Sequence, residues 1–160
     1  MHERGPLIAV CGAASPDDQT LALADAVGYE IAKAGGILVC GGLGGVMESA
    51  CSGAKRGGGL TVGIVPGSHI SAANPFVDVP IATGMADGRN AIITHTAEAV
   101  IALRGSYGTL SEVALALKMG KPVCTVGDWC PIDHVTVYQT PHDAVQGTLA
   151  ILRTRSRKRE

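Results

Sequence analysis

The stretch AVIALRGSYGTLSEVALAL, from Ala99 to Leu117, indicates the fold class of this chain. Its first five residues form a continuous apolar run, which is typical of a strand buried on both faces. Two glycines follow within the segment RGSYGT, and the helical pattern after them ends at Gly120. A buried strand, a glycine turn and a helix in this order form the repeating unit of a parallel α/β sheet.

The same unit recurs along the chain and predicts one domain. Apolar runs predict strands at 7–12, 37–40, 60–65, 77–82, 99–103, 122–127 and 134–139, and helices are predicted at 15–34, 46–56, 88–98 and 110–119 and from Thr140 onward. We therefore expect an α/β fold with a Rossmann-like doubly wound, mostly parallel sheet and helices on both faces. Residues 1–152 are expected to form this domain, and residues 153–160 a basic, disordered C-terminal tail.

Two segments carry the residues that start helices. In SPDD, Ser15 is the expected N-cap, Pro16 the first helical residue, and two aspartates lie in the first turn. In TPHD, Thr140 is the expected N-cap and Pro141 the first helical residue. Pro80 lacks the N–H group that a sheet requires, so its strand is expected at an edge.

Composition and charge exclude several function classes. The net charge of −1 makes nucleic acid an unlikely partner for the whole protein, although a nucleic-acid arm is the alternative interpretation of the basic tail. No apolar run approaches the length of a membrane span and no signal-peptide pattern is present, so we expect a cytoplasmic protein without a membrane partner. Five cysteines without a C-x-x-C pair, and scattered histidines, predict buried thiols and no metal site.

Two glycine-rich loops predict a phosphate site. The segments GGLGG, 41–45, and RGSYGT, 104–109, each follow a predicted strand and open a helix. Glycine lets backbone N–H groups approach an anion closely, and the N-terminus of a helix adds free N–H donors. Neither loop matches the dinucleotide fingerprint or the P-loop pattern, so an obvious dehydrogenase or P-loop enzyme is not indicated.

The segments CGGLGGVMESA, MADGRNAII and RGSYGTLSE, within 40–112, resemble motifs of the LONELY GUY (LOG) superfamily, which was long mislabelled as possible lysine decarboxylases. The resemblance runs from about Leu7 to about Val126 and is strongest to the branch of the molybdenum cofactor carrier proteins. It implies a Rossmann-like sheet, a homodimer or higher oligomer, and a nucleotide-like phosphate ligand. In the enzymatic members it implies hydrolysis of the N-glycosidic bond of a nucleoside 5′-monophosphate, with Arg89 and Glu112 in the essential positions.

Three residues depart from the pattern of this superfamily. Arg104 replaces a proline, Ser106 replaces a glycine, and Ser111 stands where the enzymes usually have the first of two acids. The site expected from the loops and the resemblance comprises Gly41, Gly42, Gly44, Gly45, Met47, Arg89, Asn90, Arg104, Gly105, Ser106, Tyr107, Gly108, Thr109 and Glu112. In this site the guanidinium of Arg89 is expected to hold phosphate, and Arg104 to place a second cation near it.

Glu112 has two interpretations. Thr109 and Glu112 have the spacing of a capping box, in which the two side chains satisfy each other's backbone N–H groups at the start of a helix. Alternatively, the carboxylate faces the cleft of the two glycine loops and contacts a ribose hydroxyl or a developing positive charge.

The functional hypotheses follow from these alternatives. The first is a carrier or sensor that binds a phosphorylated, nucleotide-like ligand such as a nucleoside monophosphate or the molybdenum cofactor, and requires no other cofactor. The second is a phosphoribohydrolase, and the third a purely structural protein whose glycines serve packing. A lysine decarboxylase is rejected, because the five lysines lie in helix bodies, at helix ends or in the tail rather than where a pyridoxal phosphate aldimine would need one.

Overall fold

A computed structural model describes residues 4–158 of the chain. Its strands are β1 (Leu7–Cys11), β2 (Ile37–Cys40), β3 (Thr61–Val65), β4 (Val79–Ala82), β5 (Ala99–Ala102), β6 (Val123–Val126) and β7 (Thr136–Tyr138). Its α-helices are α1 (Asp18–Lys33), α2 (Val46–Arg56), α3 (Arg89–Thr96), α4 (Tyr107–Lys118) and α5 (Pro141–Arg157), with single 3-10 turns at Ile70–Ala72 and Ala86–Gly88. Every predicted strand and helix is present.

The strands form one sheet in the order β4-β3-β2-β1-β5-β6-β7, and every neighbouring pair is parallel. The chain therefore starts in the middle of the sheet, winds outward to one edge, and returns at β5 to build the other side. This confirms the doubly wound Rossmann-like prediction. In such a sheet the direction of winding reverses between β1 and β5, and a crevice opens beyond the carboxyl ends of these strands.

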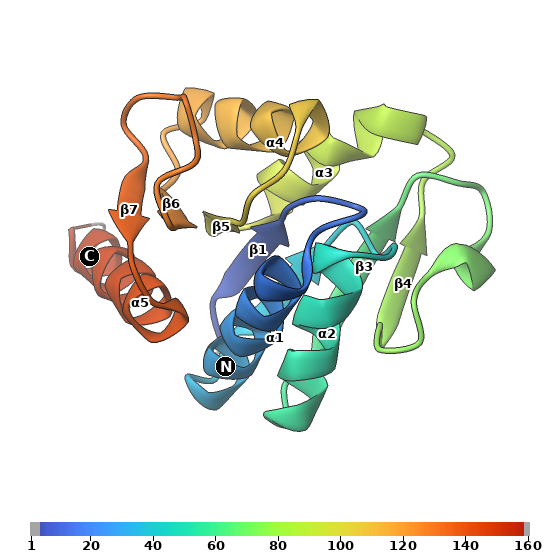
Figure 1. The fold of residues 1–160 in the computed structure, drawn as a ribbon, viewed down its shortest axis with the longest axis horizontal. Helices are drawn as coiled ribbons and strands as arrows, with labels where there is room; N and C mark the ends of the chain where they lie inside the picture. The colour runs from blue at the N-terminus through green and yellow to red at the C-terminus, as the bar shows by residue number, and fades with distance from the viewer. Residues whose placement is uncertain (1–3, 159–160) are drawn as a thin grey trace.

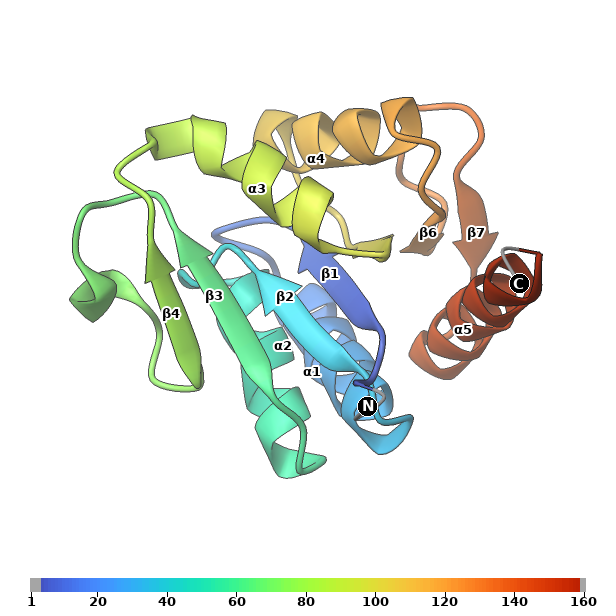
Figure 2. The same ribbon diagram turned by 180° about the vertical axis from the view of Figure 1, so that it is seen from behind.

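Helices cover both faces of the sheet (Figures 1 and 2). α1, α2 and α5 pack on one face, and α3 and α4 pack on the other. The side chains of β1 alternate between the two layers, because Ile8 and Val10 join the first core while Ala9 and Cys11 join the second. Both cores consist of aliphatic residues and cysteines, as the scarcity of aromatic residues predicts, and Cys11, Cys40 and Cys124 are buried thiols as expected.

The contact between α1 and α2 depends on two glycines. A Cβ atom on Gly28 would lie 1.9 Å from the carbonyl oxygen of Ala50, and a Cβ atom on Gly53 would lie 1.9 Å from the carbonyl oxygen of Asp25. Each helix thus presses its backbone directly against a glycine of the other. These glycines are required by close packing and not by an unusual backbone conformation.

One predicted helix start is wrong and one is confirmed. The side chain of Asp17, and not that of Ser15, caps α1: its Oδ1 accepts from the N–H group of Thr20 at 2.7 Å, and Asp18 is the first helical residue. Asp17 and Asp18 lie just after Ser15. Aspartate is as favourable an N-cap residue as serine, so the local sequence does not decide which of them caps the helix. Thr140 caps α5 as predicted, with Pro141 in the first turn.

The end of the chain differs from the expected tail. α5 continues through Arg157, so residues 153–157 are helical rather than disordered. The guanidinium of Arg155 donates to the carbonyl oxygen of Gly120 at 2.7 Å, which ties the end of α5 to the end of α4. Residues 159–160 of the predicted tail lie outside the described residues.

Pro80 lies in β4, the edge strand of the sheet, as predicted. The connection from β3 to β4 carries only one 3-10 turn, so no α-helix covers this edge (Figure 1). None of the helices within residues 4–158 has the length and apolar character needed to cross a membrane.

Candidate functional site

A cavity of about 210 Å³ opens beyond the carboxyl ends of β1 and β5. We call it the central cavity. Three loops enclose it, those that follow β1, β2 and β5, together with the start of α3. Its lining residues are Val10, Cys11, Gly12, Ala13, Ala14, Leu43, Met47, Asp87, Arg89, Asn90, Ser106, Gly108, Thr109 and Glu112. The cavity therefore lies at the point where the direction of winding reverses, which is where ligands bind in folds of this type.

Arg89 begins α3 and reaches across to the neighbouring strands. Its Nη1 donates to the carbonyl oxygens of Gly41 at 2.6 Å and Ile64 at 2.9 Å, just beyond β2 and within β3. Its Nε–H group is buried and has no hydrogen-bond partner within residues 4–158. Burial lowers the pKa of this guanidinium, and the attraction of Glu112 opposes the shift. One edge of the guanidinium is thus fixed by the fold, and the edge with Nε keeps donors for another acceptor.

Glu112 lies in the body of α4 and does not cap it. The helix begins at Tyr107 with Ser106 as N-cap, so the predicted capping box of Thr109 and Glu112 is wrong. Only 8% of Glu112 is exposed, and Thr109 is buried beside the same cavity. The spacing of Thr109 and Glu112 predicts a helix that begins after Thr109, but α4 begins one turn earlier. The actual N-cap residue, Ser106, makes no capping hydrogen bond through its side chain, so the start of the helix carries no sequence signal of that kind.

The environment of Glu112 is unusual for a carboxyl group. Burial raises its pKa to about 7, although the charge of Arg89 and a hydrogen bond with the Cys11 thiol both lower it. The pKa of the Cys11 thiol is also raised, mainly by its own burial and next by the nearby charge of Glu112. A carboxyl group that titrates near neutral pH can hold or release a proton inside a ligand site, which is a common property of functional groups.

The loop 41–45 approaches the cavity with a left-handed backbone. Gly42 and Gly45 have φ angles of +74° and +66°, which other residues rarely adopt. A Cβ atom on Gly45 would also lie 2.4 Å from the carbonyl oxygen of Ala14. The N–H group of Val46 donates to the carbonyl oxygen of Ala13 at 3.0 Å, so this loop is locked against the loop after β1. Gly41 contributes the carbonyl oxygen that holds Arg89.

The loop 104–109 brings the N-terminus of α4 to the opposite side of the cavity. Gly105 packs against Thr109, because a Cβ atom there would lie 2.0 Å from the Thr109 hydroxyl oxygen. Asn90 donates to the Ser111 hydroxyl at 3.3 Å, and Ser111 donates to the carbonyl oxygen of Gly108 at 2.7 Å. The position where related enzymes have an additional acid is therefore held by a neutral hydroxyl group in a local hydrogen-bond network.

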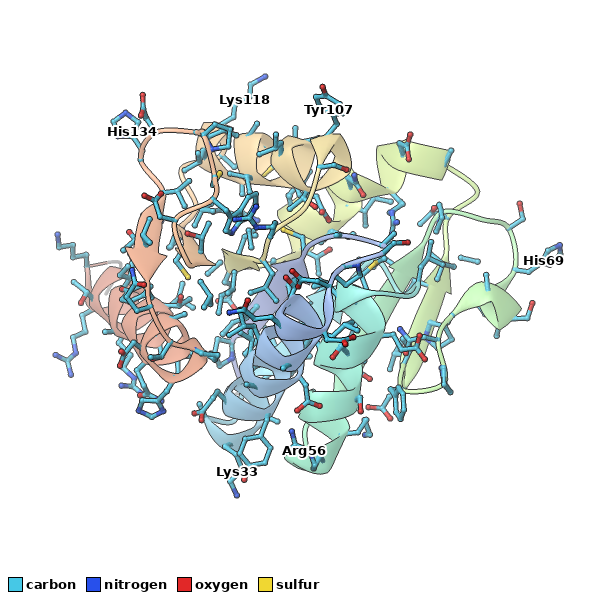
Figure 3. All side chains as sticks on the ribbon, viewed as in Figure 1. Lys33, Arg56, His69, Tyr107, Lys118 and His134 are labelled. Carbon is cyan, nitrogen blue, oxygen red and sulfur yellow. The ribbon has the colours of Figure 1, made fainter. Side chains whose placement is uncertain are left out.

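The structure does not bring every expected residue to the central cavity. Tyr107 points away from it into solvent with 89% of its surface exposed, as Figure 3 shows at the start of α4. Arg104 lines a separate cavity with Asp17 and Asp128 instead of placing a cation in this one. Five predicted glycines of the two loops are not among the lining residues either: Gly41, Gly42, Gly44, Gly45 and Gly105. Met47, Arg89, Asn90, Ser106, Gly108, Thr109 and Glu112 do meet there.

Sequence reasoning missed the loop that follows β1. Cys11, Gly12, Ala13 and Ala14 line the central cavity, whereas the sequence predicts only a strand end and a turn at these positions. A signal was present, because in a doubly wound sheet the loop after the first strand always borders the crevice. Asp87 and Leu43 also line the cavity and are not among the predicted site residues, although Leu43 lies in the predicted loop 41–45 and Asp87 in the segment MADGRNAII.

A larger and more open cavity, of about 730 Å³, lies at the amino ends of the strands. Arg4, Glu98 and Arg153 border it, and Arg4 is paired with Glu98 at 2.8 Å. This cavity holds no buried polar group without a partner among the described residues, in contrast to the central cavity. The larger volume therefore does not make this cavity the better candidate, because the residue with an unpaired buried guanidinium N–H group, Arg89, lines the central cavity.

Replacement of Arg89 by alanine is expected to lower the free energy of unfolding by about 2–4 kcal/mol. Two buried carbonyl oxygens, of Gly41 and Ile64, would lose a charged donor and remain desolvated. The change is measured by urea unfolding followed by circular dichroism. Arg89→Lys is the matched control and should recover part of the loss, and an unchanged stability in Arg89→Ala would show that these hydrogen bonds do not hold the strands.

Comparisons with known proteins agree with this architecture. An uncharacterized protein of Archaeoglobus fulgidus is 46% identical over 138 residues, which are 86% of this chain and 91% of that protein. A Mycobacterium marinum protein named cytokinin riboside 5′-monophosphate phosphoribohydrolase is 38% identical over 107 residues, which are 64% of this chain and 57% of that protein.

Two solved structures are similar over nearly their whole length. The molybdenum cofactor binding protein of Rippkaea orientalis is 35% identical, with a TM-score of 0.89 and coverage of 94% of this chain and 99% of that chain. The molybdenum cofactor carrier protein of Chlamydomonas reinhardtii is 33% identical, with a TM-score of 0.84 and the same coverage. The model of the SLOG cluster4 family matches residues 6–156. These matches confirm the resemblance read from the motifs, and the chain belongs to the SLOG cluster4 family.

Proposed function

We propose that this protein is a carrier that binds a small phosphorylated ligand of the nucleotide or pterin class, with the molybdenum cofactor as the first candidate. The observation that carries the proposal is the position of Arg89, which lines the central cavity and whose Nε–H group has no hydrogen-bond partner among the described residues. A phosphate oxygen is the acceptor that best matches such a guanidinium edge.

The surrounding loops supply the other donors for a phosphate group. The N–H groups of Tyr107, Gly108 and Thr109 open α4, and none of them has a backbone partner among the described residues. Met47 and Glu48 open α2 in the same way on the facing loop. Helix N-termini of this kind favour anions through their free donors and their dipoles. The similarity to two molybdenum cofactor proteins over almost the whole chain supports a carrier for that ligand.

Hydrolysis of a nucleoside monophosphate is the second candidate. Arg89 and Glu112 occupy the positions of the essential residues in the related enzymes, and both line the same cavity. Glycoside hydrolysis generally uses two carboxyl groups, one as acid and one as base or nucleophile. Here Ser111 replaces one acid and is engaged with Asn90 and Gly108. Asp87 also borders the cavity, but it lies in an exposed 3-10 turn. The arrangement favours binding over hydrolysis.

Two assays separate these candidates. In the first, the protein is incubated with AMP and other nucleoside monophosphates, and free base is measured by liquid chromatography beside Glu112→Ala. We expect no base release above that of the variant. In the second, the protein is mixed with molybdenum cofactor released from a denatured molybdoenzyme, and molybdenum is measured across a gel-filtration peak. We expect molybdenum to co-elute with the protein, and base release that disappears in Glu112→Ala would instead establish an enzyme.

Gly108→Ala provides a variant that affects the ligand and not the fold. A Cβ atom on Gly108 would meet nothing within 4 Å, and alanine is favoured over glycine inside a helix by up to about 1 kcal/mol. We expect the free energy of unfolding to stay equal or rise, while the added methyl group narrows the cavity and weakens ligand affinity by about tenfold or more. Gly67→Ala is the matched control, because its Cβ would also meet nothing and it lies outside the cavity. Equal affinity in both variants would place the ligand elsewhere.

Oligomeric state and compartment are part of the same proposal. We propose a cytoplasmic homodimer, on the basis of the resemblance to the LOG superfamily and of four buried cysteines that form no disulfide among the described residues. Analytical ultracentrifugation at micromolar concentration tests the dimer, and a sedimentation coefficient of a 16 kDa monomer would contradict it.

A further inference from the structure

Two cysteines are in contact beside the glycine loop 41–45. The Sγ atoms of Cys40, the last residue of β2, and Cys51, in the middle of α2, are 3.5 Å apart. Both residues are fully buried, and both are free thiols. A disulfide bond has a sulfur–sulfur distance of about 2.0 Å, so a displacement of about 1.5 Å would join the two sulfur atoms.

The sulfur atom of Cys40 also helps to hold the glycine loop. The N–H group of Gly42 donates to this Sγ atom at 3.3 Å. Gly41, the residue between them, accepts a hydrogen bond from Arg89 at 2.6 Å through its carbonyl oxygen, and the next residue, Leu43, lines the central cavity. Four consecutive residues therefore connect the Cys40 sulfur atom to Arg89 and to the wall of the cavity.

Asn74 holds the same loop at a further point. Its backbone N–H group donates to the carbonyl oxygen of Gly42 at 2.8 Å, and its Nδ2 donates to the carbonyl oxygen of Leu43 at 2.9 Å. Because the loop is bonded to Asn74 and to Arg89, it cannot absorb a movement of Cys40 by itself. A displacement at the sulfur atom therefore strains the contact between Gly41 and Arg89.

The local hydrogen bonds make Cys40 the reactive member of the pair. The hydrogen bond from the Cys51 thiol lowers the pKa of the Cys40 thiol, and the hydrogen bond from Gly42 lowers it further, although burial opposes both. The same thiol–thiol hydrogen bond, followed by burial, raises the pKa of Cys51. Burial also raises the pKa of Cys11 and Cys124. The thiolate is the form that attacks an oxidant, so these shifts favour Cys40 among the buried cysteines.

We propose that Cys40 and Cys51 form a reversible disulfide when the protein meets a peroxide, and that this bond displaces the glycine loop and Arg89 at the central cavity. The disulfide itself is independent of any ligand, whereas its effect on ligand binding rests on the proposed function. Disulfides inside cytoplasmic proteins are mostly transient and redox-sensing, which fits a pair that is reduced in this structure.

The reaction consumes two thiols and one peroxide. The Cys40 thiolate attacks one oxygen of hydrogen peroxide, an S–O bond forms, the O–O bond breaks, and the released hydroxide takes up the proton lost by Cys40. The sulfur of Cys51 then attacks the Sγ atom of Cys40, the S–S bond forms, the S–O bond breaks, and the second hydroxide leaves as water with the Cys51 proton. The two thiols lose two electrons, and the peroxide is reduced to two water molecules. Hydrogen peroxide is small and uncharged and enters by local opening of the loop, whereas burial excludes bulky thiols such as glutathione.

One protease separates the two cysteines for the test. Cleavage after glutamate residues cuts at Glu48 and leaves each of them as the only cysteine of its fragment, 31–48 and 49–98. The protein is treated with hydrogen peroxide, alkylated in denaturant, digested without reductant and analysed by mass spectrometry. We expect the two fragments to be joined, and to separate after treatment with dithiothreitol. Peroxide that modifies other cysteines only, or adds oxygen to Cys40 without joining the fragments, would overturn the inference.

Cys51→Ser and Cys124→Ser are matched variants, because both replace a buried cysteine by the same residue. In Cys51→Ser no second thiol resolves the sulfenic acid, so dimedone, which traps this acid, is expected to label Cys40. Cys124→Ser should behave as the natural chain, with joined fragments and no label. Absence of the label in Cys51→Ser would show that Cys40 is not the attacking thiol. The fragments of the natural chain decide the inference even if a variant fails to fold.

The effect on the cavity is measured after the peroxide has been removed by gel filtration. In ¹H–¹⁵N NMR spectra we expect the Gly42 amide and Arg89 Nε–H signals to move on oxidation and to return with dithiothreitol. Co-elution of molybdenum with the protein should decrease about tenfold in the oxidised form. A disulfide that leaves both signals in place would overturn the coupling to the cavity. Absence of co-elution from the reduced protein would instead contradict the proposed function, and the joined fragments would still establish the disulfide.

Discussion

Replacement of Glu112 by glutamine is expected to stabilise the protein at pH 8 and to leave its stability nearly unchanged at pH 4.5. In the folded state burial raises the pKa of this carboxyl group to about 7 from its ordinary value of 4.5. The folded protein therefore binds the proton more tightly than the unfolded chain does. Between pH 4.5 and about 7, the contribution of Glu112 to the free energy of unfolding decreases as pH rises, because the charged form must be buried.

The magnitude follows from the same linkage. A pKa of about 7 against 4.5, at about 1.4 kcal/mol for each pKa unit, gives about 3 kcal/mol at pH 8. Glutamine imitates the neutral carboxyl group and does not ionise. The attraction of Arg89 is already contained in the pKa of Glu112, so its loss does not reduce the expected gain further.

Urea unfolding of both proteins at pH 4.5 and pH 8 measures this difference. Other titrating groups contribute equally to the two proteins and cancel in the comparison. Glu112→Ala is a useful second variant, since it also removes the charge but leaves a void and should recover less stability. A glutamine variant that is less stable than the natural protein at pH 8 would contradict this prediction. It would show that the ionised carboxylate stabilises the protein through Arg89 by more than its burial destabilises it.

Gly28→Ala is expected to lower the free energy of unfolding by about 3 kcal/mol or more. The new methyl group would lie 1.9 Å from the carbonyl oxygen of Ala50, which belongs to the backbone of α2 and cannot move by itself. The two helices would have to separate along their whole contact, and the packing of the core below them would be lost with it. Gly53→Ala meets the backbone of α1 in the same manner and should be equally destabilising.

Gly147→Ala is the matched control for this prediction. It also places a methyl group in a helix, and its Cβ would lie 2.0 Å from the hydroxyl group of Tyr138. The clash is with the ring of a side chain, whose Cζ and Cε1 atoms lie 2.4 and 2.9 Å away, and not with a backbone, so the loss should be below that of Gly28→Ala. Thermal unfolding by circular dichroism compares the three variants. Equal losses in Gly28→Ala and Gly147→Ala would mean that helix contact through glycine is not what fixes α1 against α2.

The layers of the fold could be predicted from the sequence because the strands are continuous apolar runs and the helices end at glycines. The order of the strands in the sheet could not be predicted, because it depends on pairing between segments that are far apart in the sequence. Local patterns also misplaced the starts of two helices. Ser15 and Asp17 are both good caps, and Thr109 with Glu112 forms a capping-box spacing inside a helix that in fact begins at Tyr107.

The candidate site was predicted in part. The glycine loops pointed to the correct edge of the sheet, and the motif resemblance pointed to Arg89 and Glu112. Sequence could not reveal that Arg104 lines the neighbouring cavity, since two residues of one loop can face opposite sides of it. It also gave no sign of the unpaired Nε–H group of Arg89 or of the thiol of Cys11 beside Glu112, because both depend on contacts between separate elements.

The measurement that tests the central claim most directly is a comparison of two-dimensional ¹H–¹⁵N NMR spectra of the protein with and without bound molybdenum cofactor. We predict that the Arg89 Nε–H signal moves furthest, together with the amide signals of Met47, Gly108 and Thr109 around the central cavity. Changes confined to residues at the amino ends of the strands, such as Arg4 and Arg153 of the larger cavity, would contradict the account.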